Sequence, residues 1–599
     1  MYQKRICKLR ELMKKEGLDY FLFANADGHF SEYVCDYYKK RTAFSGFTGS
    51  NGTLLIGLDS AFLWTDGRYF IQAERELSGT GITLMKSGTK NVPTISEYLR
   101  RVATQDVVLG LDAEYASYRM LKQFRENFSA QIRVKIMKEL PETALEKSDS
   151  GIERKLCPSG PVIVLPDVYL DYSVRQRIED IREEMRRKNY GAFFSNKLDT
   201  NMWIMGIRGT DIEYNPYAYS YVLITENDAY LFVKPEAVTD SLVMHCTKNS
   251  ITIKEYASVI SVLSEKCSGF KTAASFAELN GYIADCCNNR GVFWADDDCG
   301  TGLRQAIKSE AETEAIRDIY IRDSVAVCKF LYWLSEQPSG SVTEYDAACK
   351  MNDLRKDIPG FLDLSFETIS AYGANAAMMH YAPEKERPVK IANGNVFLLD
   401  SGGQYNGGTT DVTRTVAIGE VSDEVKSDYT AVIRGMLALQ NAHFLYGCTG
   451  MNLDILARTP IWEKNLDYKC GTGHGIGFML GVHEGPQAIR TKGTPPASET
   501  PFMQGMLVSD EPGIYKEGKY GIRVENILLC KEACRSGEDI FMEFEPLTYV
   551  PLDPNLILAQ ELSAKEKQWI IAYHNQVCDK MRPYLNDDEF AWLLEQKIY

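Results

Sequence analysis

Residues 470–486 read CGTGHGIGFMLGVHEGP and place two histidines, His474 and His483, among closely spaced glycines. Such a stretch could cradle a phosphate, bind a metal or form a tight turn. No register of it fits the dinucleotide pattern G-x-G-x-x-G, and the chain has no G-x-x-x-x-G-K-[ST] loop. The zinc-binding pattern H-E-x-x-H fails as well, because the residue it would need as a second histidine is Gln487. Any chemistry at these histidines therefore needs partners from elsewhere in the chain.

Acidic residues in the last third of the chain are candidate partners. The segment NVFLLDSGGQYNGGTTDVTRTVAIG predicts a hairpin, with Asp400 ending the first strand and Asp411 beginning the second. Aspartate is a poor strand former, and two aspartates facing each other across a hairpin would repel unless a positive charge lay between them. The alternative is that Asp400 only caps the turn.

Two glutamates follow further along. Glu511 lies in VSDEPGIY, and Glu525 interrupts an apolar run that we expect to form a strand at 522–529. Taken alone, each carboxylate is explained most simply as a side chain on a solvent-exposed face of its segment. Four carboxylates and one imidazole together suit two hard or borderline divalent ions, which can activate a bridging water for hydrolysis. The candidate ligand set is Asp400, Asp411, His474, Glu511 and Glu525.

The overall composition limits the class of protein. A chain of 599 residues is too long for one core, so two to four domains are expected. The net charge of -15 argues against nucleic acid as a partner, and no apolar run reaches the ~20 residues that a membrane span needs. The N-terminus lacks signal-peptide features, and the fifteen scattered cysteines contain no C-x-x-C pair. We therefore expect free thiols and a cytoplasmic protein.

The first half of the chain contains a duplication. The segment RICKLRELMKKEGLDYFLFANAD, from Arg5, aligns with RIEDIREEMRRKNYGAFFSNKLD, from Arg177, at a constant offset of 172. Each copy predicts an amphipathic helix followed by a short strand, and further strand candidates are GTLLIGL, AFLWTD, SYVLIT and AYLFV. Two homologous α/β domains explain this pattern better than two unrelated helices would.

The local composition of the chain predicts two domain boundaries. The Pro-rich piece CPSGPVIVLP at 157–166 marks the first, and three glutamates ahead of a long apolar helix mark the second. The predicted domains are 1–157, 158–306 and 307–599.

Ordered motifs along the whole chain carry a family resemblance. They are TAFSGFTGSNGT, LWTDGRYFIQA, WIMGIRGTDIEYNPYAYSYVLI, MMHYAP, LLDSGGQYNGGTTDVTRT, GTGHGIG, VHEGP, SDEPGIY, GIRVEN and FEPLT. The chain resembles the pita-bread metallopeptidases and is most similar to the three-domain cytosolic aminopeptidase P (Xaa-Pro aminopeptidase) group. The resemblance implies an α/β fold with two homologous creatinase-like N-terminal domains, the second a duplicate of the first. A pita-bread (α+β) catalytic domain with a dinuclear metal site would follow.

The resemblance also assigns the ligands. Asp400 would bind one metal, His474 and Glu511 the other, and Asp411 and Glu525 would bridge both. A water or hydroxide between the metals would be the nucleophile, and manganese is the usual ion in this family. The glycines around His474 would let the backbone turn tightly and bring this histidine to the metals.

Other residues receive roles by the same resemblance. His483 would lie near the scissile carbonyl, donating to the oxyanion or moving a proton, and His380 in MMHYAP would face the substrate. Both join Glu511 as candidate catalytic residues. Arg523 would orient the ligand carboxylates, and Arg68 in TDGRYF would line the substrate entrance.

The chain departs from the family pattern at Cys470, where relatives carry histidine. Cysteine donates only weakly and does not replace an imidazole near neutral pH. We expect a tolerated exchange there, since all five ligands and the two other family histidines are present.

The implied activity is removal of the first residue from short peptides with proline in second position, by a homodimer. Proline lacks an N–H and has a fixed φ, so a pocket shaped for its ring could select it. The alternative within the family is prolidase, which cleaves Xaa-Pro dipeptides but usually lacks the duplicated middle domain. Non-catalytic binding relatives and metal-free creatinase-type hydrolases are disfavoured, because such proteins lack metal ligands that are all present here.

Overall fold

The computed structural model describes residues 2–598 except 25, 104–105, 114, 129–131, 149–155 and 494. The chain divides into two compact units, Met1–Thr301 and Gly302–Tyr599. Each unit has its own buried apolar clusters. The predicted boundaries after residues 157 and 306 remain predictions.

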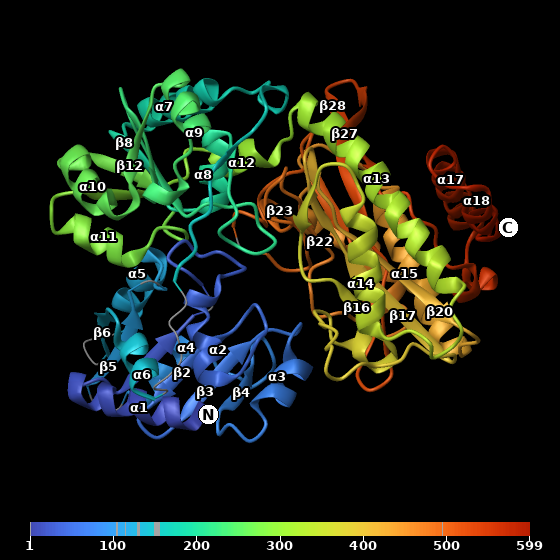
Figure 1. Ribbon diagram of the computed structural model, residues 1–599, viewed down its shortest axis with the longest axis horizontal. Coiled ribbons are helices and arrows are strands. Elements are labelled where there is room, and N and C mark those ends of the chain that lie inside the picture. Colours follow the sequence, from blue (N-terminus) through green and yellow to red (C-terminus); the bar gives the residue numbers. More distant parts are fainter. Residues whose placement is uncertain are drawn as a thin grey trace. The chain divides into compact units, whose positions relative to one another are not determined.

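The first unit contains two six-stranded sheets with the same topology (Figure 1). Their strand orders are β4-β3-β2-β1-β5-β6 and β12-β11-β10-β8-β13-β14. In both, the first strand of the copy is interior and pairs antiparallel on one side and parallel on the other. The strands of the first sheet are β1 Tyr20–Phe23, β2 Thr53–Gly57, β3 Ala61–Thr65, β4 Thr83–Lys86, β5 Val107–Asp112 and β6 Ile132–Met137. Those of the second are β8 Ala192–Ser195, β10 Ser220–Thr225, β11 Ala229–Val233, β12 Ile251–Glu255, β13 Lys271–Ala274 and β14 Phe293–Asp296.

Equivalent helices begin the two copies, and the predicted duplication is confirmed. Helix α1 (Tyr2–Glu16) and helix α7 (Val174–Lys188) have the same length, and their first residues are 172 positions apart. A buried arginine in each copy donates to a carbonyl in the next helix: Arg5 to Ala43 and Arg177 to Trp203. The other helices of this unit are α2 Lys40–Ser45, α3 Phe70–Leu77, α4 Ile95–Val102, α5 Tyr118–Asn127, α6 Leu140–Ser148, α8 Leu198–Met205, α9 Asp240–Lys248, α10 Val259–Cys267 and α11 Gly281–Asn288.

The second unit begins within the short helix α12 (Thr301–Ala306), which the long helix α13 (Glu310–Ser335) follows. Ser309 caps α13 through a reciprocal pair of hydrogen bonds with Glu312, so the predicted glutamates form its first turns rather than precede it. The remaining helices are α14 Glu344–Lys356, α15 Asp423–Gln440, α16 Gly450–Trp462, α17 Ala564–Met581 and α18 Asp587–Glu595.

Small antiparallel sheets pack beneath these helices in the second unit. Their strand orders are β15-β18-β19, β16-β17-β20, β21-β28-β27-β24, β22-β23 and β25-β26. One buried cluster contains side chains from α13, β17, α15, β26 and α17, among them Val396, Val432, Ile522 and Val577. A second cluster contains side chains from β24, β27 and β28. The strands are β15 Phe361–Leu364, β16 Ile369–Tyr372, β17 Asn395–Ser401, β18 Gly403–Tyr405, β19 Gly408–Thr409, β20 Val412–Ile418, β21 His443–Leu445, β22 Gly473–Gly475, β23 Glu484–Ile489, β24 Leu507–Asp510, β25 Gly513–Lys516, β26 Tyr520–Arg523, β27 Asn526–Ser536 and β28 Asp539–Pro546.

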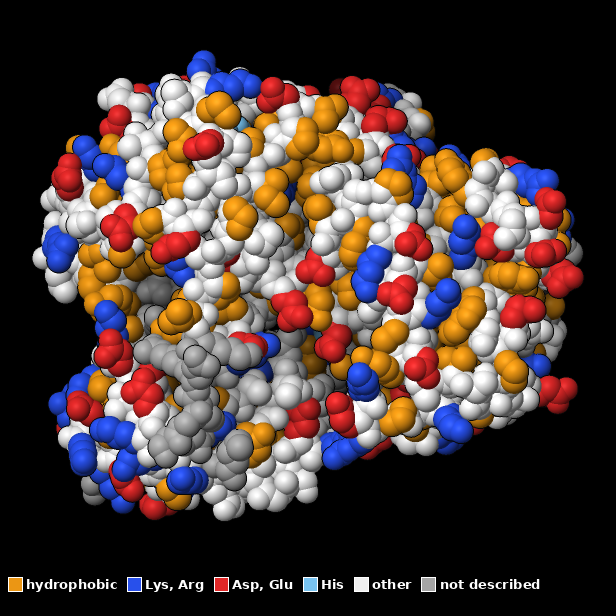
Figure 2. All heavy atoms as spheres, in the orientation of Figure 1, with side chains coloured by type: hydrophobic (Ala, Val, Ile, Leu, Met, Phe, Trp, Pro, Cys, Tyr) orange, Lys and Arg blue, Asp and Glu red, His pale blue; other side chains and the backbone are white. Residues whose placement is uncertain are grey.

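The surface mixes both signs of charge. Acidic and basic side chains are interspersed with apolar ones over the face drawn in Figure 2. Among the helices that the structure describes, none combines the length and the apolar character that crossing a membrane requires.

Candidate metal centre

The glycine-rich stretch forms strand β22, which pairs with β23 and lies against β24. The His474 amide donates to Ser509 Oγ at 2.9 Å, and the Glu511 amide donates to the Thr472 carbonyl at 2.8 Å. A Cβ at Gly473 would lie 1.9 Å from the Ser509 carbonyl oxygen. A Cβ at Gly475 would lie 2.4 Å from a carbonyl of β23.

Gly473 and Gly475 lie in strand β22 and neither has a positive φ, so the expectation that these two provide a tight turn is wrong. They are required because neighbouring backbones approach too closely for any side chain. This close packing is what places His474 between two strands.

The predicted hairpin is formed by β17 and β20, and it carries Asp400 and Asp411. The register pairs Asp400 with Thr413 and Ser401 with Val412, so the two aspartates lie diagonally and not directly opposite each other. Asp411 immediately precedes β20 instead of beginning it. The diagonal arrangement lets both carboxylates approach one site from the same edge of the hairpin.

Ligand atoms from distant segments converge there. One ligand atom each of Asp411, His474 and Glu525 lies within 4.8 Å of the other two. His474 Nε2 is 3.7 Å from Asp411 Oδ2 and 3.5 Å from Glu511 Oε1. Glu511 directly follows β24, and Glu525 lies in the short break between β26 and β27, not within one continuous strand as predicted.

Arg523 holds Asp400 at the edge of this cluster. Its Nη2 is 2.5 Å from Asp400 Oδ2 and 3.1 Å from the Met379 carbonyl oxygen, and its Nη1 donates to the Tyr515 hydroxyl at 2.7 Å. Arg523 is 3% exposed. The guanidinium therefore fixes the direction of Asp400 and ties the segment just before His380 to the same place.

The donor set fits divalent cations. Asp400 Oδ1 and Glu525 Oε1 are buried and have no hydrogen-bond partner among the residues that the structure describes. Burial first, and then the neighbouring carboxylates, raise the pKa of Asp411 and of Glu525 well above the ordinary carboxyl values. Buried oxygens that repel one another and lack donors are suited to hard or borderline metal ions.

Sequence reasoning missed two residues here. Asp510 ends β24 fully buried, and neither of its carboxylate oxygens has a partner within the described part of the chain. Burial, followed by Glu525 and Glu511, raises the pKa of Asp510 well above its usual range. Its position directly before Glu511 in SDEPG was the available signal. Thr413 Oγ1 donates to Glu525 Oε2 at 2.8 Å and was not foreseen either.

The other predicted site residues differ in how they are placed. The ring of His483 lies 4.3 Å from the ring of His474, nearly perpendicular at 87°. His380 is half-buried in the turn after the short helix η5 (Gly373–Ala377). Arg68 belongs to the first unit, where it makes a two-point ion pair with Asp66 at 2.9 and 2.8 Å.

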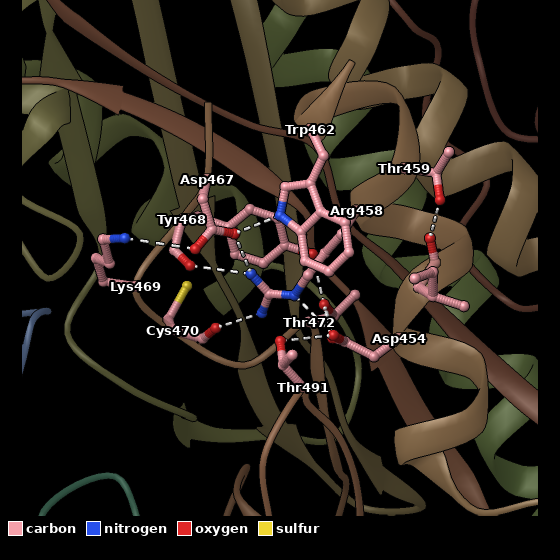
Figure 3. Close-up of polar contacts among 11 residues, drawn as sticks. Asp454, Arg458, Thr459, Trp462, Asp467, Tyr468, Lys469, Cys470, Thr472 and Thr491 are labelled. Carbon is pink, nitrogen blue, oxygen red and sulfur yellow. Dashed lines mark hydrogen bonds and ion pairs between the residues drawn. The ribbon is translucent and has the colours of Figure 1, made fainter. Parts of the chain in front are cut away.

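A buried arginine on α16 holds the chain that leads to His474 (Figure 3). Arg458 Nε donates to Asp454 Oδ2 at 2.7 Å, and its Nη2 donates to the Cys470 carbonyl at 2.8 Å. Its guanidinium also lies 3.8 Å from the centre of the Tyr468 ring. The hydroxyl of Thr472 donates to Asp454 Oδ1 at 2.5 Å. These contacts fix the segment that ends in β22.

The side chain of Cys470 is half-buried and, like that of Tyr515, packs against the core that contains Tyr468. Tyr515, which packs against the same core, accepts a hydrogen bond from Arg523, the partner of Asp400.

We expect Cys470→His to introduce a new ionisation into the pH–rate profile at about pH 6–7, where an imidazole titrates. Metal affinity should not change, because the exchange leaves all five proposed ligand side chains in place. Rates measured across pH, with manganese affinity by calorimetry as the control, test this. An unchanged profile would contradict any catalytic influence of position 470.

Comparison with known proteins agrees with this architecture. Residues 314–532 match the model of metallopeptidase family M24, and residues 540–597 match the C-terminal region of peptidase_M24. Residues 5–141 and 153–324 each match a Creatinase/Prolidase N-terminal domain.

Some relatives align with this chain over nearly its whole length. The probable Xaa-Pro aminopeptidase P of Metarhizium acridum is 36% identical, over 99% of this chain and 98% of its own length. The crystal structure of a Caenorhabditis elegans X-prolyl aminopeptidase, described as a cytosolic enzyme with a di-nuclear active site, superimposes with a TM-score of 0.92. It is 31% identical and covers 100% of this chain and 99% of that one. The Xaa-Pro dipeptidase of Bacillus anthracis is 24% identical, covers 64% of this chain and 99% of its own at a TM-score of 0.50, and shares the fold alone. The chain thus belongs to metallopeptidase family M24, in its full-length Xaa-Pro aminopeptidase P group, with two creatinase-type domains ahead of the peptidase domain.

Proposed function

We propose that this protein is an Xaa-Pro aminopeptidase that hydrolyses the N-terminal Xaa-Pro bond of short peptides. The observation that carries the proposal is the convergence of Asp411, His474 and Glu525 within 4.8 Å, beside carboxylate oxygens for which the described residues offer no donor. The full-length similarity to proteins of that name supports the substrate class.

Two divalent metal ions would be held by five side chains, which are Asp400, Asp411, His474, Glu511 and Glu525. In this assignment Asp400 serves one ion, His474 and Glu511 serve the other, and the remaining two carboxylates serve both. When bound, such ions lower the pKa of a water molecule and polarise the scissile carbonyl. Manganese is the proposed ion because four carboxylates dominate the donor set.

The other side chains act on the substrate. An imidazole N–H of His483 would donate to the carbonyl oxygen as negative charge develops on it, since this ring lies beside that of His474. His380 would deliver a proton to the leaving proline nitrogen, which has none of its own. Arg523 keeps Asp400 in a single orientation. Arg68 is proposed at the substrate entrance on the resemblance of its motif alone.

The wider organisation is proposed on similar grounds. The proposed domains are a first at 1–157, a middle one at 158–306 and a catalytic one at 307–599, and the repeated topology of the two sheets supports the first two. A cytosolic location and a homodimer are proposed with them, the former supported by the cytosolic C. elegans relative.

The decisive experiment compares the tripeptide Arg-Pro-Pro with the dipeptide Gly-Pro, using chelator-stripped protein with and without manganese. We expect manganese-dependent release of arginine and slow cleavage of the dipeptide. Cleavage of the dipeptide alone would change the proposal to prolidase, and no hydrolysis with any metal would overturn it.

Metal binding should stabilise the protein more as the pH rises. Because the pKa values of Asp411 and Glu525 are raised, the metal-free folded protein keeps protons on these carboxyls at pH values where the unfolded chain has released them. The stability of the metal-free protein therefore falls as the pH increases from the ordinary carboxyl range through the raised pKa values. Metal ions replace those protons. The manganese-induced rise in Tm, measured by calorimetry, should therefore be larger at about pH 8 than at about pH 6. A rise that is equal at both values would contradict this coupling.

A further inference from the structure

Two thiols from distant parts of the first unit contact each other. Cys35 immediately precedes the short helix η1 (Asp36–Tyr38), and Cys157 lies in the segment that leads to β7 (Ile163–Val164). Their side chains interact, and both are half-buried, so solvent-borne reagents can reach them.

Polar groups of the second α/β domain surround this pair. The Tyr219 hydroxyl donates to Cys35 Sγ at 3.5 Å. Lys234 Nζ donates to the carbonyl oxygens of Cys157 and Pro158, each at 3.1 Å, and its ammonium also interacts with the Cys157 thiol. A hydroxyl donor and a cation beside two sulfurs favour a thiolate.

The two thiols share a proton unequally. The hydrogen bond from Cys157, followed by the one from Tyr219, lowers the pKa of Cys35 to about 7. The same contact with Cys35, together with burial, raises the pKa of Cys157. The Tyr219 hydroxyl, which donates to the Cys35 sulfur, favours a thiolate at Cys35, so we take Cys35 as the nucleophile of the pair.

Other buried cysteines lack this environment. Burial raises the pKa of each of them, which keeps them as unreactive thiols near neutral pH. They are Cys246, Cys267, Cys287, Cys299, Cys328, Cys530 and Cys578. The contrast makes oxidation at the Cys35–Cys157 pair selective.

We propose that Cys35 and Cys157 form a redox-active dithiol site that hydrogen peroxide converts reversibly into a disulfide. The Cys35 thiolate attacks one peroxide oxygen and breaks the O–O bond, which gives a sulfenic acid and hydroxide. The Cys157 sulfur then attacks the Cys35 sulfur and forms the S–S bond. The hydroxyl group leaves with the Cys157 proton as water. Two electrons pass from the sulfur pair to the peroxide, and a dithiol reductant returns them.

The bond would have a structural consequence within the first unit. It would covalently close the chain between the loop before η1 and the segment that follows the first sheet. Because β2 to β6 lie inside that loop, the cross-link restricts the unfolded chain more than the folded one. We therefore expect oxidised protein to unfold at a higher temperature and to return to the original value after reduction.

The test uses the full chain, treated with stoichiometric hydrogen peroxide, alkylated and digested for mass spectrometry. The expected first product is a peptide pair cross-linked through Cys35 and Cys157 that disappears with dithiothreitol. Tyr219→Phe should slow its formation by about 3-fold or more, because the hydroxyl donor to the thiolate is lost. The matched control Cys534→Ser, which removes an exposed thiol on β27, should leave the rate unchanged.

Mapping the cross-links and the oxidised cysteines of the unaltered protein tests the proposal without any cysteine variant. Cross-links that join other cysteines first, or sulfinic acid at Cys35 with Cys157 still alkylated, would overturn it. Alkylation of both thiols after peroxide treatment, while Cys7 or Cys534 is oxidised, would overturn it as well. Cys157→Ser gives a second readout, because Cys35 should then accumulate as sulfenic acid that a dimedone probe labels.

Discussion

Glu525→Gln should abolish peptide hydrolysis and at the same time make the metal-free protein more stable. The carboxylate is buried beside Asp400, Asp411 and Glu511, and one of its oxygens has no donor among the described residues. A neutral amide removes the repulsion among these groups, and its NH₂ can donate to a neighbouring carboxylate. The same exchange removes a ligand that we propose is shared by both metal ions.

The two effects have opposite signs and different sizes. Loss of a shared ligand removes several kcal/mol of charge stabilisation, so kcat/KM should fall by about 1000-fold or more. The free energy of unfolding of chelated protein should rise, because the amide has no charge that burial and the neighbouring carboxylates disfavour.

Hydrolysis of Arg-Pro-Pro and calorimetry of chelated and manganese-loaded protein measure both effects. Manganese should raise the Tm of the unaltered protein and have little effect on the variant. The matched control is Glu517→Gln, in an exposed turn of the same unit, which should change neither quantity. A variant that is less stable without metal would contradict the view that carboxylate repulsion is stored at this site.

Much of the fold follows from local patterns in the chain. The offset of 172 that links Arg5 to Arg177 reflects two copies of one helix–strand unit, and such units keep their apolar periodicity because each buries the same face. The hairpin that carries Asp400 is equally predictable from the sequence, since apolar strands flank a glycine-rich connection. Local sequence records these features because they depend on residues near one another in the chain.

The rest depends on contacts between distant segments. Whether Gly473 serves a turn or a close approach depends on the Ser509 carbonyl, which lies on another strand. The break that places Glu525 between β26 and β27 falls within an apolar run that gives no sign of it. Asp510 could not be ranked above other acidic residues, because only its burial without donors sets it apart. Tertiary packing decided each of these.

Arg458→Met should destabilise the second unit and weaken metal binding together. Arg458 is 3% exposed and donates to Asp454, to Asp467 and to the carbonyls of Tyr468 and Cys470 (Figure 3). Removing one partner of a buried ion pair leaves Asp454 uncompensated, which costs about 3–5 kcal/mol of unfolding free energy. The loosened segment leads directly to His474, so manganese affinity should fall by about 10–100-fold, as for other groups that orient ligands.

A double-mutant cycle separates this network from ordinary packing. Asp454→Asn and Arg458→Met should be less damaging together than the sum of the two, with a coupling of about 1 kcal/mol or more. Arg434→Met is the matched control. Arg434 lies on the neighbouring helix α15 and forms ion pairs with Glu463 and Glu566, but its side chain is partly exposed. Its effect on stability should stay below about 1 kcal/mol, with manganese affinity unchanged. Equal losses from both arginines, with full manganese affinity in Arg458→Met, would mean that α16 supports the core without directing His474. A large coupling together with weakened affinity would mean that the position of His474 is set from α16 through the Cys470 backbone.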